Sequence, residues 1–252
     1  MSTANVYESL AARVYELDKP TGRSFGDIEF YAALLDGCTG PILEPAVGSG
    51  RFLIPMLQRG LMVSGTDPSE HMLAICEREA AKAGVQARLA MAAFGEQAWP
   101  EQYEAILVPA GSIQLIATFD ETREALRKML SQLAPGGRLV LDLDSLAGLA
   151  EPAGPARSWQ DGDHTLTLVS NIEERDFSAQ RLTQQLRYER WNGPVLEQQE
   201  LQRFTLRFWG VEEMRLLLEY LGAETVTVHA DYAFDAQPTE STSVTTLVAT
   251  VA

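Results

Sequence analysis

The chain has 252 residues, of which 46% are hydrophobic, so it is long and apolar enough for one large domain or for one domain with an insertion. Its formal net charge of −15 would repel phosphate backbones, which argues against nucleic acid as a partner. The two cysteines, Cys38 and Cys76, fit no metal spacing, and without a signal peptide or an apolar run of about 18 residues we expect a cytoplasmic protein with no membrane partner.

The N-terminal part of the chain is predicted to be helical. Val6, Leu10 and Val14 repeat every four residues within 5–18, which is the spacing of one helix face. Pro20 breaks this helix, and further apolar residues predict a second helix that ends near Gly37. Residues 1–40 are therefore expected to form a helical segment ahead of the first strand.

Residues 42–52, ILEPAVGSGRF, predict a strand, a tight loop and the start of a helix. Gly48 and Gly50 carry no Cβ, so a ligand can lie directly on the backbone there. Glu44, at the carboxyl end of the strand, can accept hydrogen bonds from hydroxyl or ammonium groups. In an open α/β sheet, the crevice at these strand ends is the usual ligand site.

A second acid follows the next predicted strand, at Asp67, about 20 residues after the glycine loop. A carboxylate at this spacing can accept hydrogen bonds from both hydroxyls of a ribose. The dinucleotide fingerprint needs a third glycine where Leu53 stands. A mononucleoside with an amino-acid tail therefore fits better than a pyrophosphate, and an NAD-dependent oxidoreductase remains the alternative.

These residues resemble the first motif of class I S-adenosylmethionine (SAM)-dependent methyltransferases, an acid followed by alternating glycines. Ala46 stands in place of the first glycine; it is small but disfavours a positive φ. The letters DPS at 67–69 and LAPGGRLV at 133–140 are similar to two further motifs in the same order. The resemblance, over roughly residues 40–145, implies a Rossmann-like, seven-stranded, mostly parallel sheet with helices on both faces and an antiparallel edge hairpin. It also implies SAM as cofactor and S-adenosylhomocysteine (SAH) as product.

The resemblance assigns expected contacts by position. Cofactor contacts are implied for Tyr15, Glu44, Ala46, Gly48, Gly50, Asp67, Pro68, Met72, Met91, Ala92, Ala93, Phe94, Val108 and Ala110. Acceptor contacts are implied for Tyr7, Gly111 and Ser112. A third strand is expected from Val85 to Ala92, and no acid follows it where many relatives bind the adenine amino group. Adenine recognition would then depend on backbone groups and on stacking by Met91 or Phe94.

The second half of the chain changes its pattern. A helix is expected over 121–134 with Asp120 as its cap, and a fifth strand over 138–144 that ends with Asp142 and Asp144 on one face, open to a cationic substrate. Alternating residues between 158 and 208 predict an inserted antiparallel sheet on the acceptor side or at a homodimer contact. A helix over 211–221 and two closing strands complete the pattern. The predicted domains are a lid at 1–40, a SAM-binding domain at 41–150 and 209–252, and an inserted subdomain at 151–208.

The predicted function is methyl transfer from SAM to N or O of a small molecule by in-line displacement. The methyl donor is already activated, so the protein mainly positions the reactants and excludes water. Residues 109–112 lack the Asp/Asn-Pro-Pro-Tyr motif that methylates planar amines, which favours a small-molecule acceptor. His164, in the inserted segment, is the candidate catalytic base, and no metal cluster is recognisable. A SAM-binding protein without catalysis is the second alternative.

Overall fold

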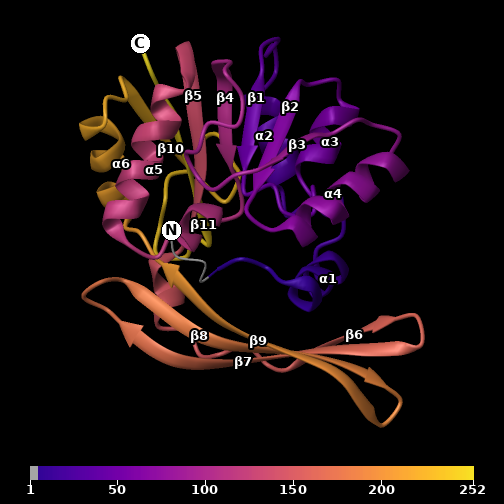
Figure 1. Cartoon of the computed structure of the whole chain (residues 1–252). Coiled ribbons are helices and arrows are strands. Elements are labelled where there is room, and N and C mark those ends of the chain that lie inside the picture. The colour runs from indigo at the N-terminus through magenta and orange to yellow at the C-terminus, as the bar shows by residue number, and fades with distance from the viewer. Residues whose placement is uncertain (1–4) are drawn as a thin grey trace.

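The computed structural model describes residues 5–252 and contains two sheets, one above the other in Figure 1. Sheet A has seven strands in the order β10-β11-β5-β4-β1-β2-β3, and sheet B has four in the order β6-β7-β8-β9. In sheet A, β1 to β5 run parallel, whereas β11 is antiparallel to both β5 and β10. The predicted fold class is confirmed.

The elements have the following bounds. Sheet A consists of β1 Ile42–Pro45, β2 Val63–Asp67, β3 Arg88–Met91, β4 Tyr103–Val108, β5 Leu133–Asp144, β10 Thr225–Ala230 and β11 Val244–Thr250. Sheet B consists of β6 Arg157–Asp161, β7 His164–Asp176, β8 Arg181–Asn192 and β9 Val195–Arg207. The helices are α1 Ser9–Asp18, α2 Asp27–Leu34, α3 Leu53–Gln58, α4 Glu70–Lys82, α5 Phe119–Ser131 and α6 Val211–Tyr220, with 3₁₀ turns η1 Ser112–Leu115 and η2 Leu146–Leu149.

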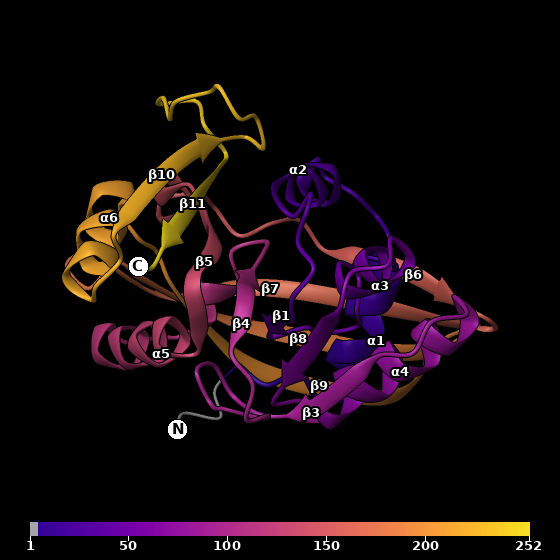
Figure 2. The same ribbon diagram turned by 90° about the horizontal axis from the view of Figure 1, so that it is seen from above.

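Helices cover both faces of sheet A, because its central strands are apolar on both sides. Figure 2 shows α5 and α6 on one side and α2, α3 and α4 on the other. Leu126 and Met214 belong to the core on the α5–α6 face, and Tyr31 and Ile54 to the core on the opposite face. The carboxyl ends of the parallel strands, where the ligand crevice was predicted, point toward sheet B in Figure 1.

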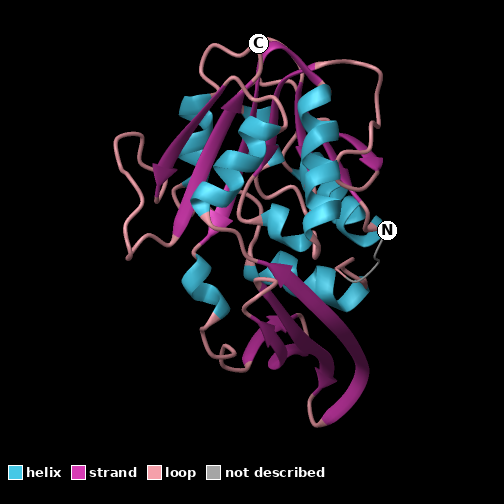
Figure 3. Ribbon diagram, turned by 90° about the vertical axis from the view of Figure 1, so that its left-hand side faces the viewer, coloured by secondary structure: helices cyan, strands magenta, loops and turns pink. Residues whose placement is uncertain are grey.

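Helix α1 packs on the inner face of sheet B rather than on sheet A alone. Leu10 and Val14 of α1 form one buried cluster with Leu166, Leu168 and Tyr188 of the sheet. Figure 3 shows how sheet B curves below the rest of the molecule. Its outer face exposes polar residues, including Gln185, Gln199 and Arg203.

Polar contacts also join α1 to sheet B. The backbone N–H groups of Leu10 and Ala11 donate to the carboxylate of Glu200 on β9, at 2.9 and 3.2 Å. Glu200 therefore caps the first turn of a helix that lies 190 positions away in the chain. Arg13 of α1 also forms an ion pair with Asp161 of β6.

The structure corrects several predicted boundaries. The first helix begins at Ser9, because residues just before it bond to sheet B; Gln202 donates to the carbonyl of Val6, for example. The third strand begins at Arg88, because the Val85 N–H completes the end of α4 by bonding to the Ala80 carbonyl.

Two further differences concern α5 and β5. Thr118, not Asp120, caps α5, and its hydroxyl accepts the Glu121 N–H. Strand β5 begins at Leu133, inside the turn that was expected to precede it. Within residues 5–252, the structure has no helix of the length and apolarity that crossing a membrane requires.

Candidate functional site at the carboxyl edge of sheet A

The loop after β1 owes its shape to left-handed backbone at several positions. Ala46 has φ +56°, Gly48 +55° and Gly50 +80°. The alanine that replaces the first glycine of the motif therefore adopts the conformation that glycine favours. This costs an L-residue about 1–2 kcal/mol, which the surrounding structure must supply.

The two glycines of the loop have different roles. A Cβ on Gly48 would meet no atom within 4 Å, so open space lies above this residue. A Cβ on Gly50 would lie 2.6 Å from the Cys76 sulfur and 3.0 Å from Ile54. Gly50 therefore permits close packing of the loop on α3 and α4, whereas Gly48 leaves room for a ligand.

The two predicted acids lie at neighbouring strand ends. Glu44 pairs in register with Gly65 of β2, and Asp67 ends the same strand. Glu44 is buried, and its Oε2 has no hydrogen-bond partner among the described residues. Burial raises the pKa of Glu44 well above its usual value, although the nearby Arg51 opposes this. A buried oxygen without a partner is costly and is the kind of group that a bound ligand satisfies.

Asp67 is fixed by the backbone around it. Its Oδ2 accepts the Gly48 N–H at 2.9 Å, and its Oδ1 accepts the Ser69 N–H at 2.8 Å. Burial raises its pKa to about 6, and these two hydrogen bonds lower it in part. The carboxylate thus links the two loops, and its remaining lone pairs are available to a ligand.

The residues around α4 and after β3 are arranged less uniformly than predicted. Met72 is buried against Ala12 and the two tyrosines of α1 and its approach, whereas Pro68 is exposed. Met91 is 66% exposed, and Phe94 packs against the α5 side of the core.

The segment after β3 also contains an acid that the sequence pattern did not single out. Ala92 is buried and Ala93 is half-buried. The Ala93 N–H donates to the carboxylate of Glu96 at 2.9 Å. The sequence pattern did not identify Glu96 because it lies after the position where relatives carry the adenine-binding acid, and because its carboxylate bonds to the backbone of the turn.

The loop after β4 is held by a buried acid that sequence reasoning placed differently. Asp142 is fully buried and accepts hydrogen bonds from the Ala110 N–H and from the hydroxyls of Tyr31, Tyr232 and Thr246. The expectation that it faces a cationic substrate is wrong, because four donors of the protein surround it. Burial raises its pKa to about 6, and these hydrogen bonds oppose the shift.

Asp142 also helps to define the backbone of the loop that was expected to line the methyl-transfer site. Ala110, which donates to it at 2.8 Å, has φ +54°, and Gly111 has φ +68°. Val108 is buried in the core, and the Ser112 hydroxyl donates to the Pro109 carbonyl. The contacts implied for Val108, Ala110, Gly111 and Ser112 therefore rest mainly on backbone groups.

Arg51, directly after the glycine loop, is a buried cation that the pattern did not predict. It forms a buried ion pair with Asp27 of α2 and donates to the Arg23 carbonyl at 2.7 Å. It thus holds the connection between α1 and α2 against the glycine loop. Because Asp27 lies 24 positions away, no local signal could have identified the pair.

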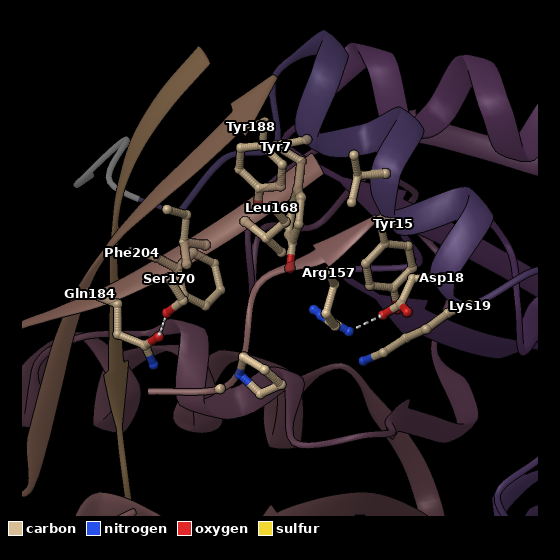
Figure 4. Close-up of a pocket in the computed structure, with 15 residues that line it drawn as sticks. Tyr7, Tyr15, Asp18, Lys19, Arg157, Leu168, Ser170, Gln184, Tyr188 and Phe204 are labelled. Atoms are coloured by element: carbon tan, nitrogen blue, oxygen red, sulfur yellow. Dashed lines mark hydrogen bonds and ion pairs between the residues drawn. The ribbon is translucent and has the colours of Figure 1, made fainter. Parts of the chain in front are cut away.

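A cavity of about 510 Å³ lies between α1, sheet B and the segment before β6, and Figure 4 shows its lining. Tyr7 and Tyr15 both line it, with their ring centroids 5.5 Å apart. Phe204 and Tyr188 contribute from sheet B. The two tyrosines of the N-terminal segment thus lie together in one cavity.

The same cavity carries a charged end that sequence reasoning missed. It is formed by Asp18 and Lys19, at the end of α1, and by Arg157 of β6. Lys19 is affected by the charges of Arg51 and Asp144, so this end of the cavity adjoins the edge of sheet A.

The structure places His164 elsewhere. It begins β7, where its ring bonds to Arg190 and lies 3.1 Å from the Glu197 carboxylate. It is not among the residues that line the cavity. The expectation that His164 covers the acceptor as a base therefore finds no geometric support, because His164 lies at the β6–β7 turn, paired with Asp161, and outside the cavity lining.

Comparison with known proteins agrees with this geometry. Residues 42–137 match the model of a family described as a methyltransferase domain. The "Putative methyltransferase YqeM" of Bacillus subtilis is 24% identical over 201 residues, which is 79% of each chain. The CcbJ methyltransferase from Streptomyces caelestis is 22% identical with a TM-score of 0.78, and each chain is covered completely. The sugar N-methyltransferase KedS8 from Streptoalloteichus is 17% identical with a TM-score of 0.75, over 100% of this chain and 98% of that one. The structural likenesses show the fold.

Proposed function

We propose that the chain transfers a methyl group from SAM to N or O of a small-molecule acceptor, a proposal that starts from the match of residues 42–137 to a methyltransferase domain. The observation that carries the proposal is the open space over Gly48, flanked by the unpartnered oxygen of Glu44 and by Asp67. These groups suit a ligand that lies against the backbone of Gly48, donates a hydrogen bond to Glu44 and offers a pair of hydroxyls to Asp67. SAM has all three.

Each group would hold a different part of the cofactor. Asp67 would accept hydrogen bonds from the ribose hydroxyls, and Glu44 would accept from a hydroxyl or from the ammonium group. Tyr15 would present an aromatic face to the methionyl end, where a ring stabilises a cation. SAM supplies an activated methyl group on its sulfonium, so the protein itself mainly orients the acceptor and excludes water.

We assign the proton-accepting role to Asp144 in place of His164. Asp144 ends β5, and its N–H donates to the Gln114 side chain at 2.8 Å. A Cβ on Gly111 would lie 2.9 Å from its Oδ2, so this carboxylate lies against the loop expected at the methyl-transfer site. It has no ion-pair partner within 4.0 Å among residues 5–252. Desolvation raises its pKa, which makes a carboxylate a better base near neutral pH.

The acceptor is proposed to enter through the cavity between α1 and sheet B. Residues 5–18 and sheet B form its two walls. The ring centroid of Tyr7, on the first wall, lies 6.0 Å from that of Phe204 on the second. This gives the inserted sheet a role on the acceptor side. The structurally similar sugar N-methyltransferase KedS8 and glycopeptide N-methyltransferase MtfA favour the same general class of acceptor.

The test measures binding and turnover separately. Calorimetry should show binding of SAM and SAH but not NAD; binding of NAD alone would instead support the oxidoreductase. Transfer of labelled methyl from SAM should then be measured over a panel of amines and hydroxy compounds. No transfer to any of them, with SAM bound, would support the alternative of a binding protein without catalysis.

Variants then test the assigned base. Asp144→Asn should lower the rate at least about a hundredfold, the usual scale for a general base, with SAH affinity unchanged. Two single variants at the β6–β7 turn, His164→Gln and its neighbour Asp163→Asn, should each leave the rate within about twofold of the parent protein. Loss of turnover in His164→Gln, with Asp144→Asn active, would reverse the assignment.

A further inference from the structure

Building on the proposed methyl transfer, we propose that the acceptor carries an anionic group, a carboxylate or a phosphate, which Lys19 and Arg157 bind at the charged end of the cavity. The protein as a whole has a net charge of −15, so two cations at one end of this aromatic-lined cavity stand against the general trend. Figure 4 shows the two side chains near each other at this end of the cavity, Lys19 from the residue after α1 and Arg157 from β6.

Lys19 is the first of the two cations. Its ammonium is half-buried and lies 5.3 Å from the centre of the Tyr15 ring. No carboxylate of residues 5–252 lies within 4.0 Å of it, so it has no ion-pair partner in the part of the chain that the structure describes. Burial lowers its pKa, and the positive charges of Arg51 and Arg157 act in the same direction. Asp18 and Asp144 oppose this shift, and an anion placed beside Lys19 would favour its charged form further.

Arg157 is the second cation. It donates to Asp18 at 2.9 Å, and its guanidinium lies 5.2 Å from the centre of the Trp159 ring. Asp18 is its one hydrogen-bond partner among the described residues, which leaves several N–H donors of the guanidinium for a ligand. Asp18 therefore orients Arg157 but neutralises only one of the two positive charges.

The rest of the lining defines the remainder of the acceptor. Tyr7, Leu168, Tyr188 and Phe204 form an apolar wall beyond the charged end. Asp144, whose charge acts on Lys19, marks the direction of the methyl-transfer loop. An acceptor with an apolar ring, an anionic substituent and a nearby amine or hydroxyl would satisfy all three features at once.

The test uses the protein saturated with SAH and three simple probes: benzoate, phenyl phosphate and the neutral isostere benzamide. We expect at least one anion to bind at least about tenfold more tightly than benzamide, since charge-assisted hydrogen bonds are roughly twice as strong as neutral ones. Comparing benzoate with phenyl phosphate tells which anion the site prefers. Lys19→Met and Arg157→Gln should each remove most of the preference, whereas Lys82→Met, on the exposed side of α4, should preserve it.

Two results would overturn the inference. One is equal affinity for the anions and for benzamide in the parent protein. The other is a loss of SAH affinity of about tenfold in Lys19→Met with anion binding intact, because Lys19 would then bind the methionyl carboxylate. Failure of the proposed function itself would look different: the parent protein would not bind SAH at all, whatever its affinity for the probes.

Discussion

The left-handed conformation of Ala46 makes a quantitative prediction. Replacing Ala46 with glycine removes the clash that disfavours φ +56°, which is worth about 1–2 kcal/mol. Against this, glycine loses more conformational entropy on folding, at a cost of about 0.5–1 kcal/mol. The two ranges leave a net stabilisation of up to about 1.5 kcal/mol. For a chain of this size, that corresponds to a rise in Tm of up to about 6 °C.

The matched control is the same chemical change where the backbone is helical. Ala81 is exposed on α4, and Ala81→Gly should destabilise the protein by about 1 kcal/mol. Both variants are measured by chemical denaturation, with SAH affinity as a check that the loop keeps its shape. If Ala46→Gly loses as much stability as Ala81→Gly, the conformational argument for the loop is wrong.

The remaining predictions concern the cofactor site. SAH affinity should fall as the pH drops below about 6, because ribose hydroxyls donate to ionised Asp67, whose pKa is raised to about 6. Asp67→Asn should weaken binding and remove this fall, and an unchanged profile would remove Asp67 from the site. Gly48→Ala should lower SAH affinity at least about tenfold with a stability loss of about 1–2 kcal/mol. Gly50→Ala should lose clearly more stability, since its Cβ would also meet the Cys76 sulfur at 2.6 Å; equal losses in the two variants would contradict the packing role.

The sequence was sufficient to predict those features that depend on the order of strands, loops and helices along the chain. The alternation of apolar runs with helices predicted sheet A, and strand-end positions placed Glu44 and Asp67 at one edge. These inferences hold because parallel strands bring their carboxyl ends together whatever the details of packing. The different roles of Gly48 and Gly50 were not predictable, because they depend on which side of the loop α4 occupies.

The features that escaped prediction depend on contacts between distant parts of the chain. The sequence predicts that Asp142 is an exposed acid at a strand end. In the structure it is buried and accepts hydrogen bonds from hydroxyls of α2 and of the segment between β10 and β11. His164 reads as a candidate base, but the length of the β6–β7 hairpin takes it away from the cavity. Lys19 reads as part of a helix stop, and only the position of β6 shows that it shares a cavity with Arg157.

The cap that Glu200 provides for α1 has a consequence for the order of folding. During synthesis, α1 emerges first, yet its N-terminal amides gain their partner only after β9 has been made. A ten-residue helix is marginal by itself in water, so α1 should remain largely unstructured through most of translation. Closing so long a loop is slow, which places it among the late steps of folding. The two walls of the acceptor cavity should therefore form together, and only once β9 has been made.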